Sequence, residues 1–269
     1  MTPSPALLLA DDEPPAFEVA GREGRSPFVL SCDHAGRRLP RALGTLGLSE
    51  AELGMHIAWD IGARAVALRL AQRLDAFVAC QRYSRLVIDC NRPLDAPDSI
   101  ATTSERILIP GNQQLTRAQA DARAHAIFHP YHAQIRDELA RRRAAGAAAL
   151  LVAVHSFTPV FLGVPRPWHV GVLFQRDARL AEPLLQLLRD EGDLVVGCNQ
   201  PYAVTDRSDF SVIDHGERRG IPHVELEIRQ DLIGDEAGQD QWAERMARLL
   251  PLAARALASP GGDTEQPKG

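Results

Sequence analysis

Short apolar runs alternate along this chain with longer segments whose apolar residues recur at helical spacing, and this alternation restricts the possible folds most. The apolar runs are typical of strands, and Asp60 precedes the first helical segment at the position of an N-cap. Such alternation predicts a mixed, mostly parallel sheet covered by helices on both faces, which is a three-layer α/β fold. The predicted strands are Phe28–Cys32, Phe77–Cys80, Leu86–Cys90, Ala148–Val154, Val170–Phe174, Leu194–Val196 and His223–Ile228. The predicted helices are Ile61–Leu74, Thr116–Arg143, Ala178–Arg189 and Gln241–Leu257.

The domain organisation is expected to be simple. The chain has 269 residues, with no internal repeat and no low-complexity linker between its ends. We therefore expect a single α/β domain over residues 16–258. Residues 1–15 are rich in proline and acidic groups, and residues 259–269 can bury no apolar surface, so we expect a mobile N-terminal tail and a disordered C-terminal tail.

Charge and composition exclude several classes of partner. The formal net charge of −5 argues against a nucleic-acid groove, and no apolar run reaches the roughly 18 residues that span a bilayer. The first residues lack the basic segment of a secretory signal. The four cysteines are widely spaced, and three lie in strand-like runs, which is typical of a reduced protein, so we expect a cytoplasmic location. The sequence carries no signal for an oligomeric state.

Polar side chains that can carry out chemistry lie at or near the ends of several predicted strands. These residues are His34, Asp89, Asn91, Arg92, His155, Glu225 and Glu227. A single histidine after a strand is more often structural, and a single aspartate more often caps a helix or forms a turn. Ligands of parallel sheets bind beyond the carboxyl ends of the strands, however, and these residues would meet there. Two histidines with a nearby carboxylate match the ligand set of a catalytic zinc with an open fourth position.

Several blocks of sequence resemble the N-formylglutamate amidohydrolase family, whose members are similar to zinc carboxypeptidases and aspartoacylases. The resemblance extends from about Pro27 to Asp235. The blocks that carry it are His34–Gly36 with Pro40, Tyr83–Arg85 through Asn91 and Arg92, His155 with Ser156, Asn199–Tyr202, His215 with Gly216, and Glu225–Arg229. The resemblance implies hydrolysis of the amide of a small N-acylated amino acid such as N-formylglutamate.

The resemblance also implies a zinc ion, held by His34, Asp60 and His155. In carboxypeptidases a second ligand follows the first histidine by three residues, but here that position is Arg37, which cannot bind a metal. We therefore expect the carboxylate ligand to be Asp60, whose alternative role is to cap the following helix.

The same resemblance implies roles for the remaining residues. Glu227 is expected to act as the general base and Arg85 to stabilise negative charge on the acyl oxygen. Glu225 is expected to be structural and to pair with an arginine, although it competes with Glu227 for the role of the base. Arg92, with Asn91, is expected to bind the substrate carboxylate. Tyr202 and His215 are expected to contact the substrate from a loop that closes over it, and the alternative role for each of them is packing.

Other functions remain open at this stage. The segment between Tyr202 and His215 lacks the paired glycines associated with formylglutamate-cleaving members, so the same site could cleave another acyl amino acid or a peptide. A non-catalytic ligand-binding homologue would retain the same pocket. A cysteine hydrolase that uses Cys32 or Cys90 is a third alternative.

Overall fold

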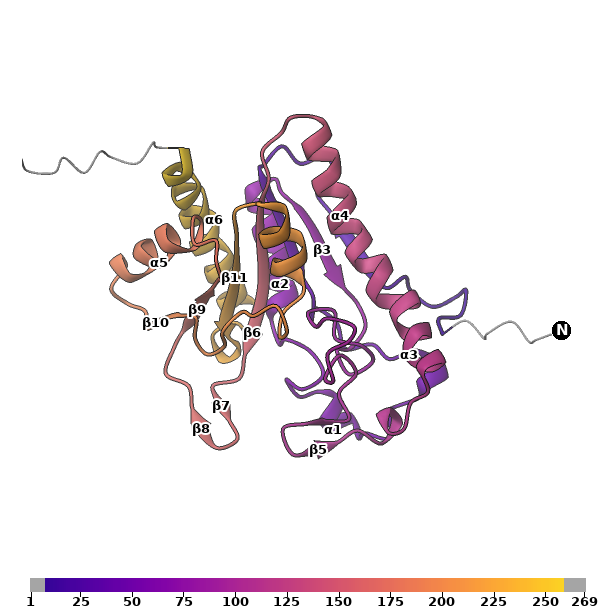
Figure 1. The fold of residues 1–269 in the computed structure, drawn as a ribbon. Helices are drawn as coiled ribbons and strands as arrows, with labels where there is room; N and C mark the ends of the chain where they lie inside the picture. The colour runs from indigo at the N-terminus through magenta and orange to yellow at the C-terminus, as the bar shows by residue number, and fades with distance from the viewer. Residues whose placement is uncertain (1–7, 259–269) are drawn as a thin grey trace, which may run out of the picture.

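A seven-stranded sheet forms the centre of the protein, whose computed structural model describes residues 8–258 (Figure 1). The order of the strands from edge to edge is β1, β3, β2, β6, β11, β9 and β10. Four of the six neighbouring pairs are parallel, whereas β1 is antiparallel to β3 and β9 is antiparallel to β11, so the predicted mixed, mostly parallel sheet is confirmed. These strands are β1 (Phe17–Ala20), β2 (Phe28–Cys32), β3 (Phe77–Gln81), β6 (Leu150–Phe157), β9 (Val170–Leu173), β10 (Val196–Cys198) and β11 (His223–Arg229).

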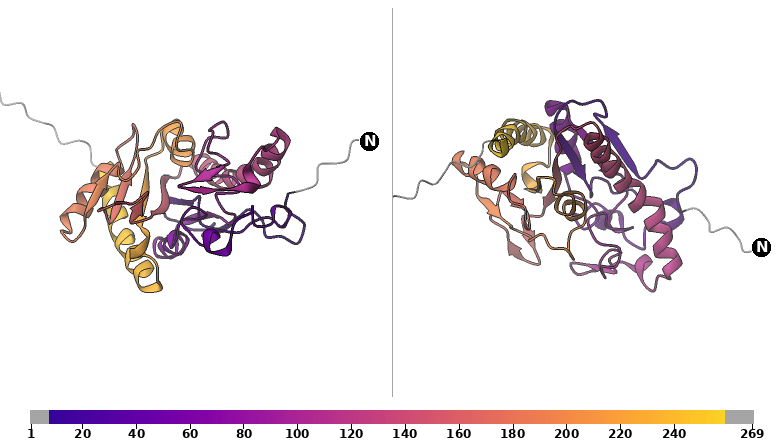
Figure 2. Two further views of the ribbon diagram at one scale, coloured as in Figure 1. Left: turned by 90° about the horizontal axis from the view of Figure 1, so that it is seen from below. Right: turned by 45° about the horizontal axis from the view of Figure 1, so that its top comes forward.

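Helices cover both faces of the sheet, which gives the predicted three layers (Figures 1 and 2). Seen from below, α2 and α6 lie on one side of the strands and α4 on the other (Figure 2, left). In addition, α5 packs against α6, β9 and the edge strand β10. The helices are α1 (Glu50–Leu53), α2 (Ala63–Leu74), α3 (Arg117–Arg123), α4 (His129–Ala144), α5 (Ala181–Asp190) and α6 (Glu236–Ala258).

The strands alternate between two apolar cores, as the two-residue period of a strand requires. On β2, Leu30 belongs to the core beneath α2, α5 and α6, whereas its neighbour Val29 belongs to the core beneath α4. On β6, Val152 likewise belongs to the core beneath α2, α5 and α6, and Leu151 to the core beneath α4. Each strand thus sends alternate side chains to the α4 face of the sheet, and that face also carries the polar residues described below.

The parallel strands β2, β6 and β11 end at the same edge of the sheet, at the bottom of Figure 1. Two short hairpins lie at this end, β4 (Thr103–Ser104) with β5 (Ile107–Leu108) and β7 (Val160–Phe161) with β8 (Val164–Pro165). Loops from different parts of the chain therefore surround the edge where the strand-end residues meet.

The segment Leu86–Cys90, predicted as a strand, is a buried irregular segment instead. Its apolar side chains pack in the core beneath α4, but side chains rather than a neighbouring strand satisfy several of its backbone carbonyls. Asn112 Nδ2 donates to the Leu86 carbonyl at 2.8 Å, Arg123 Nη1 to that of Val87 at 2.9 Å, and His132 Nε2 to that of Cys90 at 2.8 Å. An apolar run shows that a segment is buried, but it does not show what its backbone bonds to.

The long helix predicted over Thr116–Arg143 forms, with one interruption. Thr116 caps α3 through a hydrogen bond from the Gln119 amide, and a π-helical turn over Ala124–Phe128 joins α3 to α4. Pro130 follows this turn and has no N–H to donate, so a wider turn at this point is tolerated. Other boundaries shift by a few residues: β10 ends at Cys198, α5 begins at Ala181 and α6 begins at Glu236.

Helix α2 begins after a tight backbone crossing rather than after an aspartate cap. Gly62 occupies the N-cap position with a φ of 82°, and a Cβ there would lie 2.2 Å from the carbonyl oxygen of Ile233. Only glycine fits at this position. Because Asp60 makes no capping bond, its carboxylate is available to other partners.

Residues 1–7 and 259–269, which belong to the predicted tails, lie outside the described residues. Within residues 8–15, the carbonyl oxygen of Pro14 accepts a hydrogen bond from the Tyr83 hydroxyl at 2.7 Å, and Glu13 accepts one from the Arg41 amide at 2.9 Å. In the part of the chain that the structure describes, no helix is long and apolar enough to cross a membrane.

Candidate metal centre

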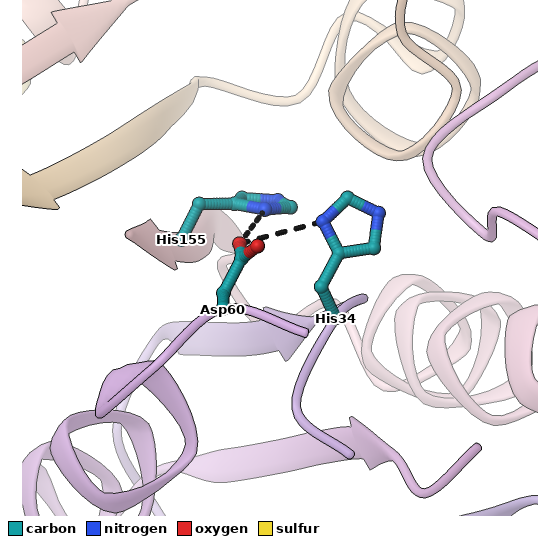
Figure 3. Close-up of side chains that lie close together, drawn as sticks. All are labelled: His34, Asp60 and His155. Carbon is teal, nitrogen blue, oxygen red and sulfur yellow. Dashed lines mark hydrogen bonds and ion pairs between the residues drawn. The ribbon is translucent and has the colours of Figure 1, made fainter. Parts of the chain in front are cut away.

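Three side chains from separate segments converge at the carboxyl edge of the sheet (Figure 3). His34 follows β2, His155 lies in β6 and Asp60 lies in the loop before α2, and all three are buried. Asp60 Oδ2 lies 2.9 Å from His155 Nδ1 and 3.4 Å from His34 Nδ1. One possible ligand atom from each residue falls within 4.8 Å of the other two. The structure therefore brings together the three residues that the sequence predicted as metal ligands.

Local backbone contacts explain why two of these segments meet. The Asp60 amide donates to the His34 carbonyl at 2.9 Å, which places the two residues side by side. The loop after His34 passes so close to Arg82 that a Cβ on Gly36 would lie 2.0 Å from the Arg82 carbonyl oxygen. The Ser156 amide also donates to Asp60 Oδ2, at 3.3 Å, and so ties the loop to β6.

The outer nitrogen of each ring faces a second carboxylate. His155 Nε2 lies 3.1 Å from Asp33 Oδ2, and His34 Nε2 lies 2.7 Å from Asp89 Oδ1. An ionised carboxylate only accepts hydrogen bonds, so each ring carries a proton on Nε2. Both Nδ1 atoms face Asp60, which accepts hydrogen bonds from them in the metal-free chain, so a metal bound between these three residues would displace the Nδ1 protons.

The electrostatics of the three aspartates indicate ionised carboxylates. For Asp60 burial opposes ionisation, but the charge on His34 and hydrogen bonds from both rings outweigh it and hold its pKa far below the ordinary value. Burial likewise opposes ionisation of Asp33, yet the His155 ring lowers its pKa to about 2. Arg85 and His34 similarly outweigh burial at Asp89 and lower its pKa strongly. Two imidazoles surrounded by three buried negative charges suit a divalent cation, and this donor set fits zinc.

Arg85 lies beside this cluster and is held in place by Asp89. Its Nη2 and Nε atoms lie 2.6 and 3.1 Å from Asp89 Oδ2, and its Nη1 atom lies 3.5 Å from Asp60 Oδ1. A guanidinium bound through two nitrogens has a fixed orientation. Arg85 therefore presents a fixed positive charge next to the candidate metal position, as the sequence prediction requires.

A cavity of about 430 Å³ opens onto the three candidate ligands. Glu225 and Glu227 lie in its wall, on the same face of β11, and Glu227 pairs in register with His155. Burial, reinforced by nearby carboxylates, raises the pKa of each glutamate to about 8. Glu227 Oε2 is buried and has no hydrogen-bond partner within the described part of the chain, whereas Glu225 accepts a bond from Asn91 Nδ2 at 3.4 Å. No arginine forms an ion pair with Glu225 among the described residues, so the prediction of such a pair is wrong.

Arg92 and Asn91 both line the cavity, but their side chains differ in availability. Arg92 Nε donates to Asp98 at 3.0 Å, and its Nη1 donates to the carbonyl oxygens of Asn91 and Ser208. The Asn91 side chain already bonds on both ends: its Oδ1 accepts from the amides of Phe210 and Ser211, both at 3.0 Å. Only Arg92, whose partner Asp98 is 59% exposed, can readily exchange that partner for a ligand.

Tyr202 and His215, both predicted to contact the substrate, lie in different surroundings in the structure. Tyr202 lies in the cavity wall, and its hydroxyl accepts a hydrogen bond from Arg166 Nη1 at 2.8 Å. His215 does not line the cavity; it is buried against His132, with 3.0 Å between His215 Nε2 and His132 Nδ1. Burial, with His132 nearby, lowers the pKa of His215 to about 3. We therefore assign His215 no substrate contact.

Several residues of the site were missed at the sequence level. Asp33 and Ser211 bond to one another, and Asp209, His56 and Glu105 line the cavity. Asp33 follows Ser31 by two residues, so its position on the α4 face could have been found from strand alternation. The loop residues carry no such periodic signal.

The buried cysteines do not favour the cysteine-hydrolase alternative. Cys32 and Cys90 are fully buried, and neither lines the cavity. A hydrogen bond to Cys80 and burial raise the pKa of Cys32, and burial raises that of Cys90. Both thiols are therefore protonated at neutral pH, whereas a cysteine nucleophile acts as a thiolate.

Comparison with known proteins identifies relatives of this chain. A family model described as N-formylglutamate amidohydrolase matches residues 26–234. A protein of Pseudomonas aeruginosa named N-formylglutamate deformylase is 30% identical over 150 residues, and one of the same name from Pseudomonas putida is 32% identical over 144 residues. Each match covers 50% of this chain and 53% of the relative, so the chain spans about half the length of the relatives that it matches.

Two crystal structures share the fold. A gene product of Agrobacterium tumefaciens has 37% identity and a TM-score of 0.90, over 94% of this chain and 100% of that one. An N-formylglutamate amidohydrolase from Ralstonia eutropha has 21% identity and a TM-score of 0.67, over 90% of this chain and 98% of that one. At 21% identity the second likeness shows the fold alone.

Proposed function

The chain belongs to the N-formylglutamate amidohydrolase family, and on that basis we propose that it is a zinc-dependent amidohydrolase. Its proposed substrate is a small N-acylated amino acid such as N-formylglutamate, whose formyl-type amide it cleaves with water. One observation carries the proposal: His34, Asp60 and His155 form a ligand set in the same cavity as the unpartnered carboxylate oxygen of Glu227. The names of the two Pseudomonas relatives, both N-formylglutamate deformylase, support the choice of formyl as the acyl group and of glutamate as the amino acid.

The proposed ligands of the metal are Nδ1 of His34, Nδ1 of His155 and the Asp60 carboxylate. When bound, zinc would lower the pKa of a bound water to about 7 and polarise the acyl oxygen. Three protein ligands leave one position for water or substrate, as in catalytic rather than structural zinc sites.

Glu227 is proposed to move the proton. Its Oε2 accepts a proton from the attacking water and then delivers it to the leaving amine nitrogen, so that the carbon–nitrogen bond breaks and formate and a free amino acid are released. Its raised pKa supports this role, because a carboxyl group that titrates near neutral pH can both accept and return a proton. Glu225 lies on the same face but is engaged by Asn91.

Arg85 is proposed to stabilise the negative charge that develops on the acyl oxygen. Its bonds to Asp89 hold it in place before the substrate arrives, so no reorganisation is needed during the reaction. Arg92 is proposed to bind the substrate carboxylate by exchanging Asp98 for it, and Tyr202 is proposed to contact the substrate at the cavity wall. A cavity of about 430 Å³ suits a molecule of this size.

The deciding experiment combines metal analysis with amine release from N-formylglutamate and from other formyl-, acetyl- and succinyl-amino acids. The wild-type protein should contain about one zinc per chain and release amine, whereas His155→Ala should lose metal and activity together. Zinc binding with no amine released from any compound would refute the catalytic proposal and favour a ligand-binding homologue. Release from another acyl compound alone would refute the proposed substrate and favour the first alternative.

A further inference from the structure

Hydrogen bonds link the outer nitrogens of the two candidate histidine ligands through a chain of buried polar residues. On one side, Asp33 Oδ2 faces His155 Nε2, and Asp33 Oδ1 accepts a bond from the Ser211 hydroxyl at 2.6 Å. On the other side, Asp89 Oδ1 faces His34 Nε2 and also accepts the Asn91 amide at 2.8 Å. Asn91 Oδ1 closes the chain by accepting the Ser211 amide at 3.0 Å.

We propose that Asp33, Ser211 and Asn91 are positioning residues, which together hold both imidazole rings with Nδ1 directed at the metal. The proposal rests on the metal site of the proposed function. It makes Asn91 a positioning residue instead of the substrate-binding residue that the sequence predicted.

Two hydrogen bonds of the Asp33 carboxylate fix the orientation of the His155 ring. Its two carboxylate oxygens have different partners, the ring on one side and Ser211 on the other, so the carboxylate cannot rotate without breaking one of the bonds. Asp33 and Ser211 have no exposed surface, so water does not compete for these bonds. A carboxylate on the outer nitrogen of a metal-bound histidine fixes its tautomer, and loss of such a partner typically reduces metal affinity 10–100-fold.

Ser211 connects this support to the wall of the cavity. It directly precedes a π-helical turn over Val212–Gly216, and the preceding residues Ser208 and Asp209 line the cavity. Asn91 fixes this segment by accepting the amides of both Phe210 and Ser211. A displacement of the wall would therefore act on the orientation of His155 through Ser211 and Asp33.

The first test measures zinc affinity of the full chain by competition with a chelator. Asp33→Ala should bind zinc 10–100-fold more weakly than the wild type, and Ser211→Ala and Asn91→Ala each roughly tenfold more weakly, at the lower end of the same range. The matched control is Ser31→Ala, because Ser31 lies on β2 two residues before Asp33, is equally buried, and its hydroxyl has no partner among the described residues. Its zinc affinity should match that of the wild type.

The second test uses the metal-free chain, so its outcome does not depend on whether the protein binds zinc and separates a failure of this inference from a failure of the proposed function. NMR of ¹⁵N-histidine protein should show slowly exchanging Nε2 protons on His34 and His155. Ser211→Ala and Asn91→Ala should each speed exchange at His155, because both weaken the support of Asp33. Neither should change exchange at His34, because the Asn91 group that bonds Asp89 is its backbone amide, which the alanine variant keeps. Unchanged exchange in both variants would overturn the proposal. An Asn91→Ala variant with a raised KM, wild-type zinc affinity and unchanged exchange would instead return Asn91 to substrate binding.

Discussion

Replacing Glu227 by glutamine is expected to reduce turnover strongly and, at the same time, to stabilise the metal-free protein at neutral pH. The physical reason is that Glu227 is buried and its Oε2 has no hydrogen-bond partner among residues 8–258, so its ionised form is poorly solvated in the folded state. Glutamine has the same shape and no charge. The variant thus removes a group that the proposed reaction needs and the folded chain accommodates badly.

The magnitude follows from the pKa, which rises from 4.5 in a free side chain to about 8 in the fold. The folded state then binds the proton more tightly than the unfolded state. Wild-type stability from this group is therefore complete below pH 4.5 and is lost as the pH rises through 8. For a single carboxyl group the loss at pH 7 is about 3 kcal/mol, and this is an upper limit because Glu225 shares the effect.

Urea unfolding of the metal-free protein at pH 5 and pH 8, together with formate release by the zinc-loaded protein, measures both effects. Glu227→Gln should gain stability over the wild type at pH 8 and little at pH 5, retain zinc, and lose turnover by a factor of roughly 10²–10⁴. The matched control is Glu225→Gln, because Glu225 lies on the same face with a similarly raised pKa. It should gain similar stability and keep most of its turnover. Full turnover in Glu227→Gln, or the larger loss in Glu225→Gln, would refute the assignment of the base.

The remaining predictions concern charge and reactivity in the cavity. Arg85→Gln should retain zinc and lose roughly 10²–10³-fold in kcat, measured by formate release, because a fixed charge beside the acyl oxygen is removed; a loss confined to KM would contradict this role. Asp98→Asn should lower KM about threefold, because Arg92 loses a partner that competes with the substrate and an exposed pair contributes at most ~1 kcal/mol; an unchanged KM would argue against a carboxylate site at Arg92. Iodoacetamide should leave activity intact while alkylating the exposed Cys198, as mass spectrometry would show; inactivation that tracks modification of Cys32 would revive the cysteine-hydrolase alternative.

The proposed metal ligands could be predicted from sequence because strand ends carry a strong signal. Continuous apolar runs stop close to His34 and at His155, and parallel strands bring such positions to one edge. Asp60 was expected as a ligand only through the family resemblance, since its spacing before a helix is also typical of a cap. The backbone crossing at Gly62 decides between the two roles, and such a contact depends on Ile233, far along the chain.

The rest of the site depends on contacts between distant loops, which leave no periodic pattern. The run Leu86–Cys90 is as apolar as a strand, yet side chains of Asn112, Arg123 and His132 bond its carbonyls. His215 and Tyr202 have the same kind of loop sequence around them, but only Tyr202 reaches the cavity. The link between Asp33 and Ser211 joins residues 178 positions apart, and no local rule predicts it.

Because Gly62 crosses so close to the Ile233 carbonyl, the presence of the three proposed ligands in a homologous sequence does not by itself show that the homologue keeps the metal site. Any larger residue at position 62 would force the backbone apart and carry Asp60 away from both imidazoles, although the three ligands remained in the sequence. A chain with His, Asp and His in place but with alanine or serine at this glycine should therefore be scored as a candidate for lost activity.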